Sequence, residues 1–393
     1  MISAPSPSPF ALTDEQGELR ELARRLATDR YAPLAQEWDR ERTPLPAEEV
    51  SRQAELGLLG MTLPERYGGG ARPLYDSLIV LEQLAKASIV AGWPVFETNT
   101  GPVRVIEMFG TPEQKERFIP PVCSGESLIA VAISEPDAGS AATDATVRGR
   151  RDANQMVLNG VKRWCSGAGH AEQYLVYVRL AADHGAAGIG AVLVDRDTPG
   201  LSFGLQEQLM GFRGVPSADM TFEDVRVPLD NVIIEAGGFK RLFTAFSIER
   251  LGNATNSLAC AQAALDKAAL YVEQRRQFGK EIIEFQTIQA ALADMIVQVE
   301  AARLLIRRAA ENAGSGAPPP IEASIAKCFS NEMAKRVTDQ AIQILGGYGY
   351  SAEYDVERMH RDAHGWALAG GTPTMQRIRI ASEYLGRRFD QRA

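Results

Sequence analysis

The chain has 393 residues, 45% of them hydrophobic, so it is long enough to bury the cores of two or three domains. Its formal net charge of −8 argues against nucleic-acid partners, which require a concentrated basic face. Cys123, Cys165, Cys260 and Cys328 are widely spaced, which predicts neither a disulfide framework nor a zinc site and fits a reducing cytoplasm. No stretch approaches the roughly 18 continuous apolar residues that a membrane span needs.

The N-terminal third of the chain has helical periodicity. Residues 1–12 are rich in Ser and Pro and are expected to form a flexible tail rather than a signal peptide. Residues 13–127 follow as a helical domain, with leucines such as Leu78 and Leu81 at helical spacing. Thr111 before Pro112 predicts a helix N-terminus, because Thr is a good N-cap and Pro fits the first helical position.

The middle of the chain, residues 128–235, changes to short strands. The dipeptide Asn159-Gly160 separates two short strand patterns, at 155–158 and 161–164, and predicts a β-hairpin turn between them. Further strands are expected at 174–178, 190–194 and 220–227. We therefore expect a compact β domain here.

Residues 236–393 return to helical patterns. A loop rich in Gly and Pro at 314–320 separates two long helices, and Gly346-Gly347 ends the second. The order helices, strands, helices predicts a mainly α protein with a central β domain and a C-terminal helical bundle.

One carboxylate stands out in the first helix of the C-terminal domain. Glu249 shares a stripe with Leu242, Phe246, Asn253 and Asn256 at spacings of three and four residues. A carboxylate on an inward face is costly unless it has a partner or a function. Two interpretations remain open: an ion pair with a neighbour such as Arg250, or a catalytic base.

Several motifs, each weak alone, follow one another in a specific order. They are SEPDAGS at 134–140, KRWCS at 162–166, LMGFRG at 209–214, FEDVRVP at 222–228, RRQFG at 275–279, QILGGYGY at 343–350, RDA at 361–363 and ALAGGTPTMQ at 367–376. In this order the chain resembles the acyl-CoA dehydrogenase family over nearly its whole length. The resemblance implies an FAD enzyme with an N-terminal helical domain, a β domain and a C-terminal four-helix bundle, assembled as a homotetramer.

The resemblance also implies which residues bind FAD. Backbone donors, hydroxyls and a flat apolar wall suit a flavin. Trp164 matches the wall and Ser166 the hydroxyl that reaches flavin N5, while Arg275 and Phe278 match residues that reach the FAD of a neighbouring subunit. The full implied set is Ile133, Ser134, Gly139, Ser140, Trp164, Ser166, Arg275, Phe278, Gln286, Gln343, Gly346, Gly347, Thr372 and Thr374.

The chain departs from the family at its catalytic position. Many members carry the base that removes the substrate's α-proton where this chain has Gly370. The segment 247–251 resembles the isovaleryl-CoA dehydrogenase branch, in which the base lies in this helix, so we expect Glu249 to be the base and the Gly370 N–H to bind the thioester oxygen. The expected substrate contacts are Trp93, Phe96, Glu97, Ser140, Arg250 and Gly371.

These residues predict FAD-dependent α,β-dehydrogenation of a short, branched or cyclic acyl thioester, carried by CoA or a carrier protein. Electron-transfer flavoprotein or another acceptor would reoxidise the enzyme. The tail at 368–372 also resembles 3-sulfinopropionyl-CoA desulfinase, which leaves a C–S lyase as an alternative. A catalytically silent flavin- or acyl-CoA-binding subunit is a second alternative. His360 and His364 have the spacing of a helical metal pair, but no third ligand is evident and no metal is expected.

Overall fold

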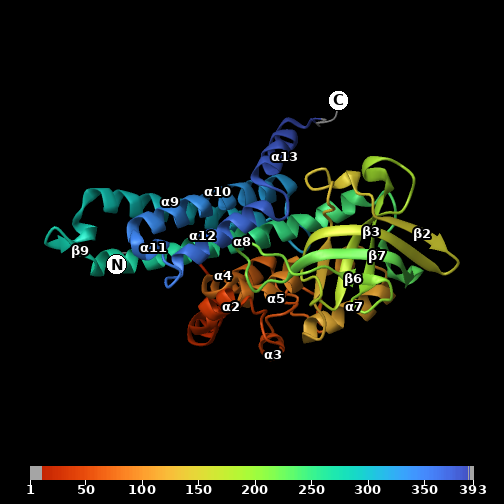
Figure 1. The fold of residues 1–393 in the computed structure, drawn as a ribbon, viewed down its shortest axis with the longest axis horizontal. Coiled ribbons are helices and arrows are strands. Elements are labelled where there is room, and N and C mark those ends of the chain that lie inside the picture. Colours follow the sequence, from red (N-terminus) through yellow and green to blue (C-terminus); the bar gives the residue numbers. More distant parts are fainter. Residues whose placement is uncertain (1–10, 388, 390–393) are drawn as a thin grey trace, which may run out of the picture.

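The computed structural model describes residues 11–387 and 389, so most of the predicted tail lies outside the described part of the chain. The N-terminal domain is helical, as predicted (Figure 1). Its α-helices are α1 (Asp14–Leu26), α2 (Ala35–Glu41), α3 (Ala47–Glu55), α4 (Leu74–Ala87), α5 (Ile89–Thr100), α6 (Val103–Phe109) and α7 (Pro112–Ser124).

The predicted start of α7 is confirmed. The Thr111 hydroxyl accepts a hydrogen bond from the Gln114 N–H at 3.2 Å, and the Gln114 side chain accepts one from the Thr111 N–H at 2.9 Å. This reciprocal capping box satisfies two N–H groups that the first turn of a helix leaves unpaired.

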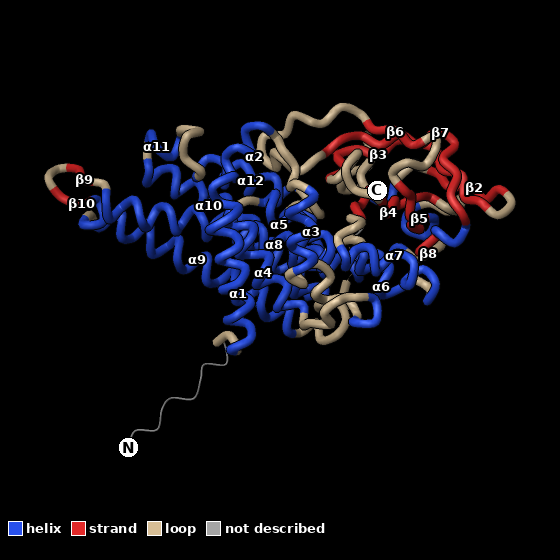
Figure 2. The backbone as a smooth tube through the Cα atoms, turned by 90° about the horizontal axis from the view of Figure 1, so that it is seen from below, coloured by secondary structure: helices blue, strands red, loops and turns tan. Residues whose placement is uncertain are grey.

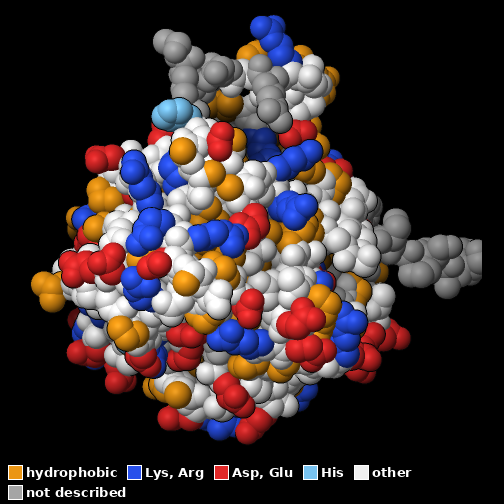
Figure 3. Space-filling view, turned by 90° about the vertical axis from the view of Figure 1, so that its right-hand side faces the viewer, with side chains coloured by type: hydrophobic (Ala, Val, Ile, Leu, Met, Phe, Trp, Pro, Cys, Tyr) orange, Lys and Arg blue, Asp and Glu red, His pale blue; other side chains and the backbone are white. Residues whose placement is uncertain are grey.

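The β domain is a single mixed sheet. Its strands are β1 (Ile129–Ala132), β2 (Arg148–Asp152), β3 (Gln155–Ser166), β4 (Gln173–Arg179), β5 (Ile189–Asp195), β6 (Leu201–Phe203), β7 (Ser217–Pro228) and β8 (Val232–Ile234). The order is β6-β7-β3-β2-β4-β5-β8, and β1 pairs with β4 in parallel. Figure 3 shows this end of the molecule, where acidic and basic side chains are interspersed.

The predicted hairpin at Asn159-Gly160 is wrong. Both residues lie inside the continuous strand β3, where the register with β7 shifts between Leu158 and Gly160. Asn159 does not turn the chain; its side chain exchanges two hydrogen bonds with Asp224 on β7, at 3.0 and 2.9 Å. The turn falls at Ala153, which has a φ of 52°. A left-handed Gly within a strand forms a bulge as readily as a turn, and strand pairing decides between them.

The C-terminal domain is a bundle built on α8 (Phe239–Gln274), which at 36 residues is the longest helix. The other elements are α9 (Gln286–Glu311), α10 (Pro320–Leu345), α11 (Gly347–Tyr350), α12 (Val356–Leu368), α13 (Pro373–Leu385) and the short strands β9 (Arg276–Gln277) and β10 (Lys280–Glu281). Helix α8 packs against α9, α10 and α12 within the bundle and against α4 and α5 of the N-terminal domain. It therefore joins the two helical layers, as Figure 2 shows.

The predicted fold class is confirmed: a mainly helical chain with a central β domain. Among residues 11–387 and 389, no helix is both long and apolar enough to span a membrane. One core cluster runs from Ala23 in α1 to Trp366 in α12, which shows that the N-terminal and C-terminal helices share their interior. The candidate site lies within this shared interior, where α5 crosses α8.

Candidate active site

The crossing of α5 and α8 depends on a glycine. A Cβ atom on Gly252 would lie 2.3 Å from the Thr100 hydroxyl and 2.8 Å from the Phe96 ring. Only Gly lets the two helices approach this closely. Glu97 and Glu249 each lie one turn before this contact, so the crossing brings two carboxyl groups into one buried region.

The structure brings Glu249 to Gly370, although these residues lie on different elements. Gly370 occupies the turn after α12 with a φ of 66°. A Cβ atom placed on it would lie 3.6 Å from Glu249 Oε1, 3.5 Å from Lys327 Cε and 3.8 Å from Asn253 Nδ2. Glu249 therefore projects toward the space that a side chain at position 370 would enter.

Burial dominates the electrostatics of these carboxyl groups. It raises the pKa of Glu249 to about 8, against the opposing effects of the positive charges on Arg250 and Lys327. Burial and the nearby charge of Glu249 also raise the pKa of Glu97 well above its usual range. Among the described residues none donates a hydrogen bond to the Glu249 carboxylate, which leaves that group free to face a substrate.

Arg250 is almost fully buried beside Glu249 but is not paired with it. Its Nη1 donates to the Ser247 hydroxyl at 3.2 Å, and its guanidinium lies over the rings of Phe243 and Phe246, at 5.6 and 5.2 Å. Within the described part of the chain its Nε has no hydrogen-bond partner. The interpretation of Glu249 as half of a close ion pair with Arg250 is therefore not supported.

Two of the six expected substrate contacts line a cavity. Trp93 and Glu97, on one face of α5, border a cavity of ≈ 360 Å³ between α3, α5 and the β domain. Phe96 faces elsewhere: its ring meets that of Trp366 edge-on at 5.4 Å, and Trp93 stacks on Trp366 at 6.5 Å. Phe96 thus packs against Trp366 and does not line the cavity. A ligand in this cavity would contact the side chains of Trp93 and Glu97.

The predicted flavin wall is an open aromatic surface. Trp164 is 52% exposed and has a φ of 61°, and the Arg163 guanidinium lies over its indole at 4.3 Å. Ser166 follows on the same strand, and the Arg163 N–H donates to the Ser134 carbonyl at 2.8 Å. The two β-domain motifs that carry Ile133, Ser134, Trp164 and Ser166 are therefore adjacent in space.

Sequence reasoning missed the ion pair that holds these motifs together. Lys162 is fully buried, and its Nζ donates to Glu135 Oε1 at 2.9 Å and to the Ile133 carbonyl at 2.8 Å. Glu135 also accepts hydrogen bonds from the Thr146 and Val147 N–H groups. A lysine in a predicted strand, at the start of the motif KRWCS, was the available signal. Through these hydrogen bonds, the ion pair holds the backbone of residues 133–135 in place.

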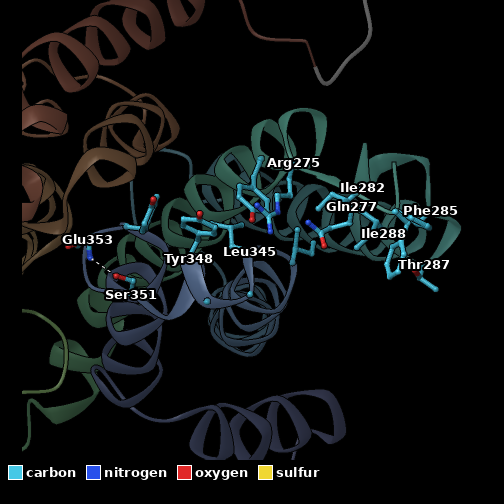
Figure 4. Close-up of a pocket in the computed structure, with 16 residues that line it drawn as sticks. Arg275, Gln277, Ile282, Phe285, Thr287, Ile288, Leu345, Tyr348, Ser351 and Glu353 are labelled. Carbon is cyan, nitrogen blue, oxygen red and sulfur yellow. Dashed lines mark hydrogen bonds between the residues drawn. The ribbon is translucent and has the colours of Figure 1, made fainter. Parts of the chain in front are cut away.

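Four other residues predicted to bind FAD form a second group at the far end of the bundle. Arg275, Phe278, Gly346 and Gly347 border a groove of ≈ 820 Å³, shown in Figure 4. Phe278 is 93% exposed, and no atom lies within 4 Å of a Cβ placed on either glycine. The structure places Gln286 and Gln343 close in sequence to this groove as exposed residues that do not line it.

The two groups lie far apart. Figure 1 shows β9, next to Arg275 and Phe278, at one end of the molecule and β3, with Trp164 and Ser166, toward the other. Gly139, Ser140, Gly371 and Thr374 are exposed, while Thr372 caps α13 by accepting a hydrogen bond from the Met375 N–H at 3.4 Å. A single chain therefore does not bring all of these residues to one ligand.

The donor chemistry of the β-domain group fits FAD, because it offers an accessible indole face, a hydroxyl and backbone amides beside open glycines. The histidine pair has a structural role instead: His360 Nδ1 shares a hydrogen bond with the Thr338 hydroxyl at 3.0 Å. Across residues 11–387 and 389, no three His, Cys, Asp or Glu residues gather as metal ligands would.

The three-domain fold, with a half-buried carboxyl group on α8 and an exposed indole on the β domain, is that of flavin-dependent enzymes that act on acyl thioesters. The three domain descriptions of the acyl-CoA dehydrogenase family match successive parts of the chain: the N-terminal domain at residues 13–126, the middle domain at 130–225 and the C-terminal domain at 236–385. The chain belongs to the acyl-CoA dehydrogenase family. It is an FAD-dependent oxidoreductase of that family.

Three relatives illustrate the range of its similarities. The chain is 39% identical to a 3-sulfinopropanoyl-CoA desulfinase of Paraburkholderia xenovorans over 98% of its own length and 99% of the relative. It is 37% identical to a mitochondrial short-chain specific acyl-CoA dehydrogenase of Mus musculus, over 93% and 89%. The solved structure of butyryl-CoA dehydrogenase from Megasphaera elsdenii superposes with a TM-score of 0.92 at 35% identity, covering 96% of this chain and 99% of that one.

Proposed function

We propose that this protein catalyses α,β-dehydrogenation of a short, branched or cyclic acyl thioester, with Glu249 as the base. One observation carries the proposal: Glu249 Oε1 lies 3.6 Å from the position of a Cβ atom on Gly370. The carboxylate therefore reaches the space beside the residue where many family members place theirs. A half-buried carboxyl group that accepts no hydrogen bond from the described residues, and whose pKa desolvation raises to about 8, suits proton abstraction.

The roles of the residues follow from this position. The Gly370 N–H donates to the thioester oxygen, which stabilises the negative charge that develops there as the α-proton leaves. Glu249, in its ionised form, takes that proton. FAD, when bound, supplies the hydride acceptor, N5, for the β-carbon. Trp93 and Glu97 limit the acyl cavity, which favours short substrates.

The FAD site in this proposal is shared between subunits of a homotetramer. The β-domain group would hold the flavin of its own chain, and the groove of Arg275 and Phe278 would hold the adenosine side of a neighbour's cofactor. The separation of the two groups within one chain supports this arrangement. Electron-transfer flavoprotein as acceptor and a cytoplasmic location remain predictions.

A desulfinase-like C–S lyase is the second candidate, because the chain is 39% identical to a relative named 3-sulfinopropanoyl-CoA desulfinase. The position of Glu249 next to Gly370 favours dehydrogenation over this reaction, since a proton-abstracting group serves the former directly.

An anaerobic titration separates the candidates. The purified protein is mixed with butyryl-, isobutyryl-, isovaleryl-, cyclohexanecarbonyl- and 3-sulfinopropanoyl-CoA in turn, and flavin absorbance and sulfite are followed. Bleaching by one of the first four compounds supports dehydrogenation. Sulfite release without bleaching favours the lyase, and neither signal favours a silent binding subunit.

A further inference from the structure

A lysine on α10, Lys327, lies near the proposed base, Glu249, which is on α8. Lys327 is fully buried, and its Cε lies 3.5 Å from the position of a Cβ atom on Gly370, the same point that Glu249 Oε1 approaches to 3.6 Å. The two side chains thus border one small space from two helices. Within the described part of the chain Lys327 forms no ion pair. Its Nζ donates only to neutral oxygens.

These neutral oxygens belong to a buried amide network. Lys327 Nζ donates to Asn331 Oδ1 at 2.8 Å and lies 3.4 Å from the Trp366 carbonyl. Asn331 Nδ2 donates to Asn253 Oδ1 at 2.9 Å and to the Ser257 hydroxyl at 2.7 Å. Every member of this network is buried, so each hydrogen bond restricts its neighbours.

The network ends on the backbone that precedes Gly370. Asn253 Nδ2 donates to the carbonyl of Trp366 at 3.1 Å and to that of Ala369 at 3.3 Å. Two side chains, Asn253 on α8 and Lys327 on α10, therefore hold the end of α12 through its backbone carbonyls. The position of the Gly370 N–H depends on this turn.

We propose that Lys327 is a positioning residue: its ammonium group favours the ionised form of Glu249, and its amide network fixes the Gly370 turn. The proposal rests on the proposed function in one respect, that Glu249 is the base. Removing the lysine charge disfavours the carboxylate and so raises the pKa of Glu249, because an opposite charge nearby favours ionisation.

Charged and titratable groups approach Glu249 from several elements, and the test must separate their effects. Burial and the charge of Arg250 lower the pKa of Lys327, while the charge of Glu249 opposes this shift. The two groups therefore titrate as a coupled pair. The groups that face the pair are Arg250 on α8, Glu97 on α5, Tyr177 on β4 and Cys328 on α10, with Arg379 on α13 acting on Arg250.

The first experiment is a pH profile of flavin reduction. Anaerobic stopped-flow reduction by the most reactive acyl-CoA of the panel is measured in the FAD-loaded wild type, in Lys327→Met and in the control Lys335→Met. Lys335 lies on the same helix but pairs with Glu332 at 2.9 Å near the surface. Lys327→Gln, which retains a hydrogen-bond donor, replaces Lys327→Met where the latter does not fold.

The expected result is a shift of the rising limb to higher pH by about 1–3 units in Lys327→Met. The rate at high pH should return to within a few-fold of the wild-type value, and Lys335→Met should keep the wild-type profile. A loss of rate that is equal at every pH, or a profile that does not move, overturns the electrostatic role.

The second experiment does not depend on catalysis. Thermal unfolding of Glu249→Gln, Lys327→Met and the double variant forms a mutant cycle. Coupling between the charges predicts that Lys327→Met lowers the melting temperature less in the Glu249→Gln background than in the wild type; additive losses overturn the proposal. If Glu249→Gln leaves flavin reduction intact, the base assignment fails, yet this cycle still measures the Glu249–Lys327 interaction.

Discussion

The base pocket and the far groove are built in opposite ways. Glu249, Lys327 and Asn253 approach one another at the shared helical core, where α8, α10 and the turn after α12 come together. The groove at Arg275 and Phe278 is open, and its most prominent aromatic ring is 93% exposed. The first region has its proposed chemical groups in place within one chain, whereas the second presents apolar surface with nothing from the described chain to cover it.

This contrast separates two kinds of residue that the motifs alone do not distinguish. A residue in the base pocket should affect chemistry through its charge, because burial makes every charge there expensive to leave unpaired. A residue in the groove should affect cofactor retention and assembly, because only a ligand or a second subunit can complete that surface. The following variants test this division.

Glu249→Gln should have the largest effect. The change keeps shape but removes basicity, and a general base contributes about 10²–10⁴-fold to rate. Flavin reduction by acyl-CoA, followed anaerobically, should fall by at least that factor while FAD content and acyl-CoA binding persist. A matched control is Glu273→Gln, an exposed position near the end of the same helix. An unchanged rate in Glu249→Gln would move the chemistry elsewhere and favour the lyase.

Arg275→Glu should act on the groove instead. Arg275 lines it with its guanidinium 5.8 Å from the Tyr348 ring, so a carboxylate there would repel a phosphate-bearing ligand. Loss of one charge-assisted contact corresponds to about 10–100-fold weaker FAD binding. Equilibrium dialysis and size-exclusion chromatography check the FAD content and the expected tetramer.

The control for the groove is Arg276→Glu, because Arg276 is exposed next to Arg275 but does not line the groove. It should retain FAD. A wild-type monomer that holds one FAD per chain would contradict the shared site.

Trp93→Ala should change substrate preference more than rate. The indole borders the cavity of ≈ 360 Å³, and its removal enlarges that space. Because one methylene group in a hydrophobic pocket is worth about 10–200-fold in discrimination, the ratio of kcat/KM for longer to shorter acyl-CoAs should rise by about tenfold. A folded variant with the parent's ranking would make Trp93 a packing residue only.

The sequence predicted local features and singled out Glu249. It did not predict the tertiary contacts that these features make. Thr111 marked its helix start correctly because capping is local, whereas the same kind of local evidence at Asn159-Gly160 failed because pairing with β7 decided the outcome. The spacing of apolar residues on α8 predicted that Glu249 faces inward, where burying a carboxylate costs free energy. Only the fold shows that this carboxylate lies next to Gly370.

Lys327 was not singled out, because a lysine within a helical repeat usually lies at the surface. The residues one turn before and after it, Ala323 and Asn331, are both buried in the structure, so this face of α10 points inward. The groove residues, by contrast, lie far from the β-domain group, and this separation is set by the fold and not by local spacing.

The smallest expected effect comes from returning a carboxylate to position 370. In the Glu249→Gln background, Gly370→Glu would place its Cβ at ordinary contact distances of 3.5–3.8 Å from Lys327, Glu249 and Asn253 in the parent structure. The φ of 66° opposes any side chain, at a cost of about 1–2 kcal/mol, so the new carboxylate should restore flavin reduction by only about tenfold. Gly370→Gln in the same background carries the same strain without a base and should restore nothing. Equal recovery by both variants would mean that backbone shape at position 370, rather than a carboxylate beside Lys327, limits the reaction.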